Sequence, residues 1–205
     1  GHSGLVVTDL VNIRYLTGFT GSHAVLLVPA AGECTFFTDG RYIDQARLQV
    51  AIEQQEISRN LLAAVASREL EGWTAETHAI TVDDWRALGT LPAAGNLVES
   101  LRLIKDEPEI EALTQACDIS TAALMRLWDE PLLGVSERQI ARRIESFMRE
   151  LGAEDRAFDT IVASGPNSAI PHHEPTERLV ETGDFLKIDF GALVEGYRAD
   201  CTRTV

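Results

Sequence analysis

The apolar positions of the first hundred residues fall into short runs that alternate between extended and helical patterns. The predicted strands are residues 5–7, 24–28, 34–37, 50–53 and 78–80. The predicted helices are residues 9–15, 41–48, 61–65 and a segment that follows Thr81. Asp9 and Asp39 are the expected N-caps of the first two helices, and Gly18 ends the first. This alternation predicts an α/β domain over residues 1–103.

Residues 104–205 begin with a more regular helical pattern. Asp106 gives a strong helix start, and apolar residues then recur at helical spacing up to Trp128. A second helix is expected to begin at a capping box, Ser136–Gln139. A strand over 158–164 and a glycine-bounded hairpin follow. Helices that precede antiparallel strands predict an α+β domain.

Composition and charge narrow the classes of function. The 205 residues are 45% hydrophobic and 24% charged, which is ordinary for a folded soluble protein. The net charge of −14 opposes binding to nucleic acid and to anionic membranes. No apolar run reaches the roughly 20 residues of a membrane span. The three widely spaced cysteines indicate a reducing compartment, so we expect a cytoplasmic protein.

Two aspartates in the C-terminal hairpin give the strongest chemical signal. If Val194 and Glu195 form the turn, Asp189 lies directly opposite Asp200 on one face of the sheet. Opposed carboxylates, with Cβ atoms about 4.5–5.5 Å apart, repel unless a cation lies between them. A pair of divalent metal ions would remove that repulsion. The alternative is a solvated surface hairpin, although Asp189 interrupts an apolar strand where an unpartnered carboxylate is costly.

A histidine pair, His172 and His173, lies between the predicted strand and the hairpin. Histidines beside prolines usually belong to exposed loops. Because histidine titrates near neutrality, it also suits proton transfer or the stabilisation of an oxyanion beside a metal ion. The segment enters the sheet that carries the two aspartates, which favours a catalytic role.

Several motifs occur together along the chain. They are Ser-Gly-Pro-Asn-Ser-Ala-Ile-Pro-His at 164–172, Ile-Asp-Phe-Gly at 188–191, Gly-Tyr at 196–197 before Asp200, and Thr-Arg-Thr at 202–204. This combination resembles the proline-specific metallopeptidases, aminopeptidase P and prolidase, which share the pita-bread fold with methionine aminopeptidase and creatinase. Two earlier motifs are similar to the family's smaller N-terminal domain, Asn-Ile-Arg-Tyr-Leu-Thr-Gly-Phe at 12–19 and Thr-Asp-Gly-Arg-Tyr at 38–42.

The resemblance implies a creatinase/prolidase-like N-terminal domain with a mixed sheet, followed by an incomplete α+β pita-bread domain. It also implies two divalent metal ions, with manganese expected and cobalt, zinc or iron compatible with the same ligands. Asp189 would bind one metal and Asp200 would bridge both. His172 would contact the substrate or the transition state, and His173 is the weaker choice for that role.

The resemblance places further residues near a proline-containing peptide substrate. Tyr197 and Arg203 match motif positions that we interpret mainly as structural support, with substrate contact as the alternative. The family favours a homodimer in which the N-terminal domain helps to cover the site. Arg41 is therefore a candidate to reach the site of a neighbouring subunit.

The implied activity is hydrolysis of Xaa-Pro peptide bonds, as an aminopeptidase or a dipeptidase. The family uses a further histidine and two glutamates as metal ligands, all C-terminal to the Thr-Arg-Thr motif, whereas the sequence stops at Val205. We therefore expect an active full-length metallopeptidase and an inactive 205-residue fragment. One alternative is a pita-bread module that binds a peptide or partner without catalysis. A creatinase-type amidinohydrolase is a weaker one, because that chemistry does not use the metal pair.

Overall fold

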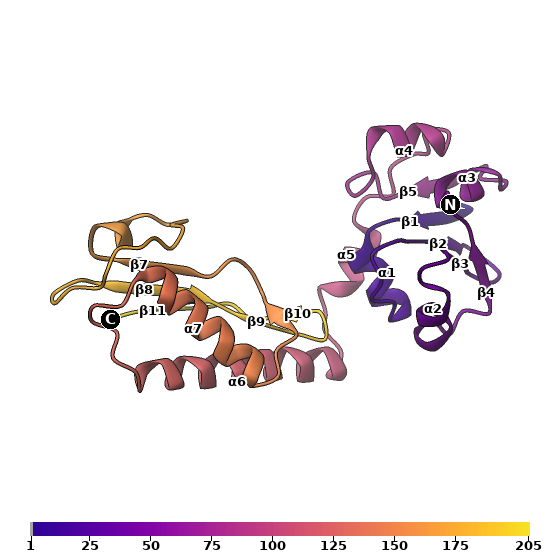
Figure 1. The fold of residues 1–205 in the computed structure, drawn as a ribbon. Helices are drawn as coiled ribbons and strands as arrows, with labels where there is room; N and C mark the ends of the chain where they lie inside the picture. Colours follow the sequence, from indigo (N-terminus) through magenta and orange to yellow (C-terminus); the bar gives the residue numbers. More distant parts are fainter. Residues whose placement is uncertain (1) are drawn as a thin grey trace. The chain divides into compact units, whose positions relative to one another are not determined.

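The computed structural model describes residues 2–205 (Figure 1). Its contacts divide the chain into two compact units, Gly1–Ile104 and Lys105–Val205. The boundary expected from the sequence lay between residues 103 and 104. The first unit has two buried hydrophobic clusters and the second unit has one, so no core is shared between the units.

The first unit is built on a five-stranded mixed sheet with the strand order β4-β3-β2-β1-β5. Its strands are β1 (Gly4–Val7), β2 (Ala24–Pro29), β3 (Thr35–Thr38), β4 (Gln54–Ile57) and β5 (Trp73–Ala75). The pairs β1–β2 and β2–β3 are antiparallel, whereas β1–β5 and β3–β4 are parallel. The mixed sheet expected for this domain is confirmed.

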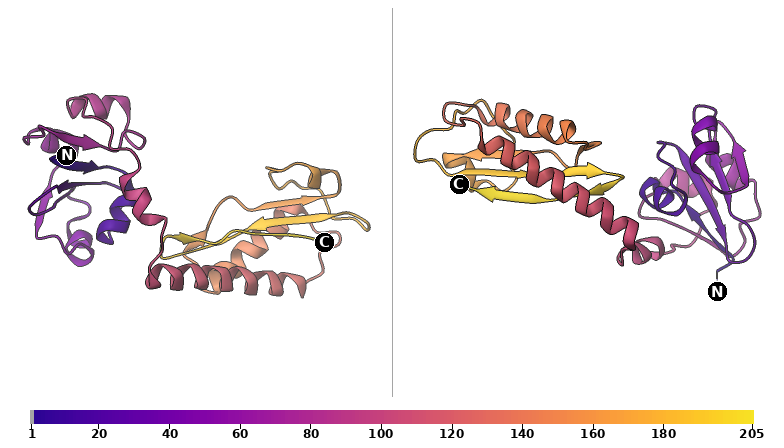
Figure 2. Two further views of the ribbon diagram at one scale, coloured as in Figure 1. Left: turned by 180° about the vertical axis from the view of Figure 1, so that it is seen from behind. Right: turned by 90° about the horizontal axis from the view of Figure 1, so that it is seen from below.

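Short helices lie on both sides of this sheet (Figure 2). They are α1 (Leu10–Thr17), α2 (Ile43–Gln49), α3 (Leu61–Ala66), α4 (Val82–Ala87) and α5 (Leu97–Arg102). Neighbouring residues of a strand point to opposite faces. Val6 therefore packs in the core that contains α3, whereas Val7 packs in the core that contains α1. Burial on both faces explains why the central strands are apolar throughout.

The first helix has both predicted caps, although it continues two residues beyond the predicted end at Tyr15, to Thr17. Asp9 accepts a hydrogen bond from Val11 N, and Gly18 closes the helix with a φ of 76°. The cap predicted at Asp39 is wrong, because α2 begins after Tyr42. The carboxylate of Asp39 instead accepts hydrogen bonds from the backbone and the guanidinium of Arg41.

Two predicted strands are also wrong. Residues 50–53 hold the end of α2 and a bend, and the strand begins only at Gln54. β4 is a polar edge strand, so no hydrophobic alternation marks its position. Residues 78–80 form turns and bends, whereas β5 lies earlier in the chain and pairs with β1.

The second unit begins with α6 (Glu107–Trp128) and α7 (Glu137–Glu150). Both helices start at the predicted residues. Asp106 and Glu109 form a capping box on α6, and Ser136 and Gln139 form one on α7. Each box satisfies backbone N–H groups that a helix leaves without partners at its first turn.

The strands of the second unit are all antiparallel and form two three-stranded sheets, β10-β9-β6 and β11-β8-β7. They are β6 (Asp155–Arg156), β7 (Ile161–Ser164), β8 (Leu186–Phe190), β9 (Ala192–Val194), β10 (Tyr197–Arg198) and β11 (Cys201–Thr204), and the 3-10 helix η1 (Gly165–Ala169) follows β7. α6 and α7 lie against one face of the strands (Figures 1 and 2).

Burial alternates strictly along β8. Leu186, Ile188 and Phe190 are buried in the core with α6 and α7. Lys187 and Asp189 are only half-buried and point to the other face. We call this second side of β8 and β11 the open face.

Among residues 2–205, none of the helices is both long enough and apolar enough to cross a membrane.

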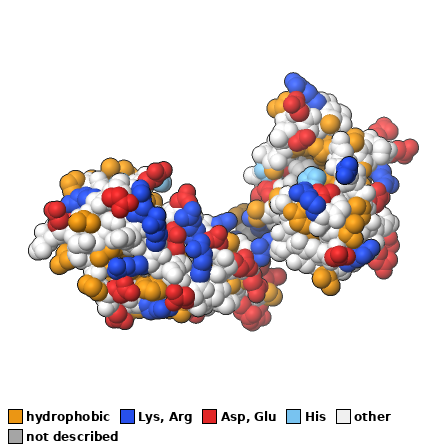
Figure 3. Space-filling model, in the orientation of Figure 1, with side chains coloured by type: hydrophobic (Ala, Val, Ile, Leu, Met, Phe, Trp, Pro, Cys, Tyr) orange, Lys and Arg blue, Asp and Glu red, His pale blue; other side chains and the backbone are white. Residues whose placement is uncertain are grey.

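In the space-filling view, basic and acidic side chains are interspersed over the second unit (Figure 3). That face therefore presents no broad patch of a single charge sign.

Candidate metal centre

The hairpin that carries Asp189 and Asp200 does not have the predicted register. Its turn is Glu195–Gly196, because Val194 pairs with Tyr197. The φ angles of the two turn residues are 49° and 86°, as a two-residue type I′ turn requires. The prediction placed the turn one residue too early because it did not require positive φ at both turn positions.

The corrected register pairs Asp189 with Thr202, so direct opposition of the two aspartates is wrong. The same register places Asp200 opposite Gly191, which makes the aspartates diagonal neighbours. Because this register differs from the predicted one by two residues, both carboxylates stay on the open face; a shift of one would have separated them. Diagonal neighbours lie about 7–8 Å apart, which leaves room for ions between their carboxylates.

Gly191 allows the strands to approach beside Asp200. A Cβ atom built on Gly191 would lie 1.8 Å from the carbonyl oxygen of Ala199. Any side chain there would push the two strands apart. The Asp-Phe-Gly sequence therefore contains both Asp189, a possible metal ligand, and Gly191, which permits the two strands of the hairpin to approach closely.

The two carboxylates have unused oxygen atoms. Asp189 accepts a hydrogen bond of 2.8 Å from Thr202 Oγ1, and Asp200 is exposed. Within residues 2–205, no lysine, arginine or histidine forms an ion pair with either aspartate. Two carboxylates on one open face are a partial ligand set for a divalent metal ion. Their chemistry fits the metal site that the motifs imply.

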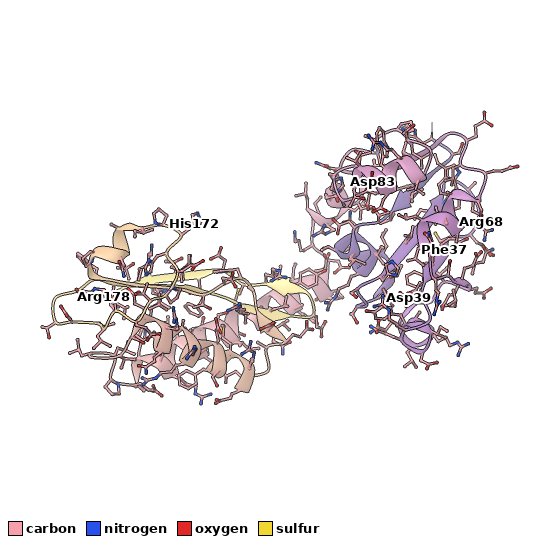
Figure 4. All side chains as sticks on the ribbon, turned by 45° about the horizontal axis from the view of Figure 1, so that its top comes forward. Phe37, Asp39, Arg68, Asp83, His172 and Arg178 are labelled. Atoms are coloured by element: carbon pink, nitrogen blue, oxygen red, sulfur yellow. The ribbon has the colours of Figure 1, made fainter. Side chains whose placement is uncertain are left out.

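The segment that carries His172 is attached to the same open face. Lys187 lies two residues before Asp189, and its Nζ donates to the carbonyl oxygens of Ile170 (2.7 Å) and Pro171 (3.3 Å). His172 follows directly and is exposed (Figure 4). Lys187 thus brings the histidine segment to the strand that carries the first aspartate, a contact that no sequence pattern indicated.

His173 has a different environment from its neighbour. It is 8% exposed, and its Nε2 lies 2.8 Å from Oε2 of Glu137. An imidazole committed to a buried carboxylate is poorly placed to meet a substrate. The structure therefore separates the two histidines into an exposed one and a structural one.

Glu137, which the sequence analysis missed, is the centre of a buried hydrogen-bond network. Its oxygens also accept hydrogen bonds from Ser164, Asn167 and Thr176. Burial raises the pKa of Glu137, but hydrogen bonds from His173, Asn167 and Thr176 outweigh that effect and hold the pKa well below its ordinary value. The only sequence signal was an acidic residue in the first turn of a capped helix, which is common.

Tyr197 and Arg203 lie on the helix-covered side of the hairpin, according to its register. The hydroxyl of Tyr197 donates to Oε1 of Glu109 in α6 at 2.7 Å. Arg203 pairs with Ile188, a core residue, and its guanidinium donates to the carbonyl of Thr202. The contact with α6 supports the structural interpretation of Tyr197, whereas Arg203 is exposed on the edge strand β11.

Arg41 belongs to a polar cluster in the first unit. Its guanidinium donates to Asp39 at 2.7 Å, and Nδ1 of His23 lies 2.7 Å from the same carboxylate. The side-chain and backbone hydrogen bonds from Arg41 hold the pKa of Asp39 well below its ordinary value. The Arg41 side chain is nevertheless 68% exposed, so part of the guanidinium faces solvent.

A second group of metal-ligating residue types, Asp9, His78 and Glu99, lies in the first unit, with potential ligand atoms within 4.8 Å of one another. Glu99 accepts hydrogen bonds from Asn12 and from His78 Nε2 (3.1 Å). Asn12 in turn accepts one from Arg102. This network joins α1 to α5 through Oε1 of Glu99, whereas Oε2 of Glu99 is buried without a hydrogen-bond partner among the described residues.

Comparison with known protein families establishes the membership of the chain. The Creatinase/Prolidase N-terminal domain matches residues 1–106, and Metallopeptidase family M24 matches residues 111–205. The chain therefore belongs with the creatinase/prolidase proteins, and its second unit matches the M24 metallopeptidases. The family and the two-domain fold expected from the motifs are confirmed, and the M24 match implies divalent metal ions.

Individual relatives agree with this assignment. An uncharacterized peptidase, YqhT of Bacillus subtilis, is 37% identical over 216 aligned positions that cover the whole chain and 61% of the relative. The Xaa-Pro dipeptidase of Pyrococcus furiosus is 43% identical over 110 positions, which cover 54% of the chain and 32% of the relative.

Solved structures show the same fold. The Xaa-Pro dipeptidase of Bacillus anthracis matches the whole chain with a TM-score of 0.94 at 35% identity, and 60% of that protein is covered. The prolidase of Pyrococcus furiosus matches it with a TM-score of 0.89 at 27% identity, with 62% covered. The chain thus spans about three fifths of the length of these two proteins.

Proposed function

We propose that the full-length protein hydrolyses the peptide bond before proline, as a metal-dependent Xaa-Pro aminopeptidase or dipeptidase. One observation carries this proposal: Asp189 and Asp200 share the open face to which Lys187 attaches the His172 segment. The match of residues 111–205 to Metallopeptidase family M24 supports the reaction class. Several relatives are named as Xaa-Pro dipeptidases or aminopeptidases, which supports the substrate class.

Two divalent ions, manganese by preference, would be held by Asp189 and Asp200 together with ligands outside these 205 residues. We propose that Asp189 would help to hold one ion and that Asp200 would help to hold both. Carboxylate oxygens suit manganese and also accept cobalt, zinc or iron. When bound, such ions lower the pKa of a coordinated water, so that hydroxide is available at neutral pH.

The protein residues have distinct parts in this proposal. His172 donates a hydrogen bond to the oxyanion that develops on the scissile carbonyl. Thr202 Oγ1 holds one oxygen of Asp189, which orients the carboxylate before the ions bind. Lys187 binds the two carbonyls that precede His172 and so limits the positions that the imidazole can take.

Replacement of Asp189 by Asn in the full-length protein tests the proposal. The amide keeps the shape but loses the charge, so we expect the bound metal to fall and Xaa-Pro cleavage to drop by about 100-fold. Metal content is measured by elemental analysis and cleavage with a proline-containing dipeptide and a longer peptide. Glu195→Gln, an exposed carboxylate of the same hairpin, is the matched control and should change neither. Full activity and full metal content in Asp189→Asn would reject the proposal.

We also propose a cytoplasmic homodimer in which Arg41 reaches the site of the neighbouring subunit. The exposure of the Arg41 guanidinium supports this idea, because Asp39 occupies its donors only in part. Light scattering on the full-length protein measures the subunit number.

A further inference from the structure

Glu137 is a buried carboxylate that the proposed reaction does not use. It is the first residue of α7, and 0% of its surface is exposed. A buried charge is costly unless hydrogen-bond donors satisfy its oxygens. The helix N-terminus contributes partial positive charge, but the donors themselves come from residues distant in the sequence.

These donors lie at both ends of the segment that carries His172. Oε1 accepts from the backbone N (2.7 Å) and Oγ (2.8 Å) of Ser164 and from Nδ2 of Asn167 (3.0 Å). Oε2 accepts from the backbone N (3.0 Å) and Oγ1 (2.7 Å) of Thr176, and Nε2 of His173 lies 2.8 Å away. One carboxylate thus closes residues 164–176 into a loop with a fixed base.

Lys187 attaches the far part of the same loop. Its Nζ binds the carbonyls of Ile170 and Pro171, directly before His172. The loop is therefore held at its base by Glu137 and near its tip by Lys187. A segment held at two places has less conformational freedom to lose when its histidine must adopt one geometry.

We propose that Glu137 is a positioning residue, which sets the His172 imidazole beside the aspartates by holding both ends of the 164–176 loop. The inference rests on the proposed function, because Glu137 takes part in catalysis only through His172. Glu137 itself touches neither substrate nor metal. The loop, rather than His172 alone, is then the functional unit.

Glu137→Gln in the full-length, metal-loaded protein provides the first test. Glutamine keeps the shape but places an amide NH2 against the donors on one side of the network. We expect kcat for an Xaa-Pro peptide to fall by about 100-fold, as for a catalytic group displaced by about 1 Å, while metal content stays unchanged. Glu145→Gln is the matched control, because Glu145 lies on the same helix, has a side chain that is 14% exposed, and pairs with Arg156 rather than with a residue of the 164–176 loop.

A double-mutant cycle with His172→Ala separates positioning from a general effect on the fold. If Glu137 acts through His172, Glu137→Gln causes little further loss of kcat once His172 is replaced. An equal loss in both backgrounds would overturn the inference. Should Glu137→Gln fail to fold, Thr176→Val removes one donor with little change in volume and is expected to give a smaller coupled loss.

Hydrogen exchange of the full-length protein tests the loop without reference to activity. The amides of Ser164 and Thr176 both donate to Glu137, so Glu137→Gln should accelerate their exchange, whereas Glu145→Gln should not. Unchanged exchange at both amides would overturn the inference. If the wild-type protein cleaves no Xaa-Pro peptide, the proposed function fails on its own, and the exchange result alone decides whether Glu137 holds the loop.

Discussion

Four carboxylates of this protein fall into two groups that differ in burial. Glu137 and Asp39 are buried and accept several hydrogen bonds, which hold both pKa values low. Asp189 and Asp200 lie on the open face and form no ion pair with the described residues. The first group serves the fold, whereas the second has oxygen atoms available for metal ions.

The low pKa of Glu137 predicts a pH dependence of stability. Because the folded-state pKa lies below the ordinary value of 4.5, the folded protein binds the proton less readily than the unfolded chain does. The stabilisation by the carboxylate is therefore complete above pH 4.5 and is lost as the pH falls below that value towards the folded-state pKa. Glu137→Gln, which cannot ionise, should lack this part of the dependence.

Denaturant unfolding of wild type and Glu137→Gln, at neutral pH and in acid, measures this effect. The wild type should be more stable at neutral pH by on the order of 3 kcal/mol, because a buried charged network loses one partner. The difference should shrink in acid. A difference that stays constant across this range would show that the charge of Glu137 contributes nothing.

At the scale of elements, local signals predicted the helices better than the strands. The capping boxes of α6 and α7 lie within four residues of sequence, so pattern alone located both helix starts. β4 was misplaced because it is a polar edge strand, and β5 because three residues beside a turn carry little pattern. Strands depend on partners elsewhere in the chain, and those partners leave no local mark.

The hairpin turn gives a prediction at this scale. Glu195 has a φ of 49°, a conformation that Asn adopts more readily than Glu, and Asn-Gly is the preferred pair for a type I′ turn. Glu195→Asn should therefore raise the free energy of unfolding by roughly 0.5–1 kcal/mol. Thermal or denaturant unfolding measures the change.

Gly196→Ala is the matched comparison, because its φ of 86° is unfavourable for any residue with a Cβ atom. It should lower stability. If Glu195→Asn were destabilising and Gly196→Ala neutral, the turn, and with it the register that places Asp189 and Asp200 diagonally, would be wrong.

At the scale of the whole molecule, the proposed site draws on more than this chain of 205 residues. The relatives are longer, and the chain covers 61% of YqhT. If Arg41 acts on the site of the neighbouring subunit, two variant subunits that lack different residues can complement each other in a mixed dimer. An Arg41→Ala subunit keeps its aspartates, and an Asp189→Asn subunit keeps its Arg41.

Mixed dimers of these two full-length variants should therefore be more active than either homodimer. The intact aspartates of one subunit would then meet the intact Arg41 of the other. Steady-state Xaa-Pro cleavage, measured after co-expression and separation by two different tags, gives the result. Activity no higher than the mean of the two homodimers would contradict a role of Arg41 in trans.

The amino-acid sequence determined the family, the two-domain organisation, the capped helices and the common face of Asp189 and Asp200. These features depend on motifs and on spacings between residues that lie close together in the sequence. Tertiary structure alone decided the hairpin register, the attachment of the His172 segment by Lys187 and the network around Glu137. The donors to Glu137 lie 27 to 39 residues from it in sequence, so only folding brings them to one carboxylate.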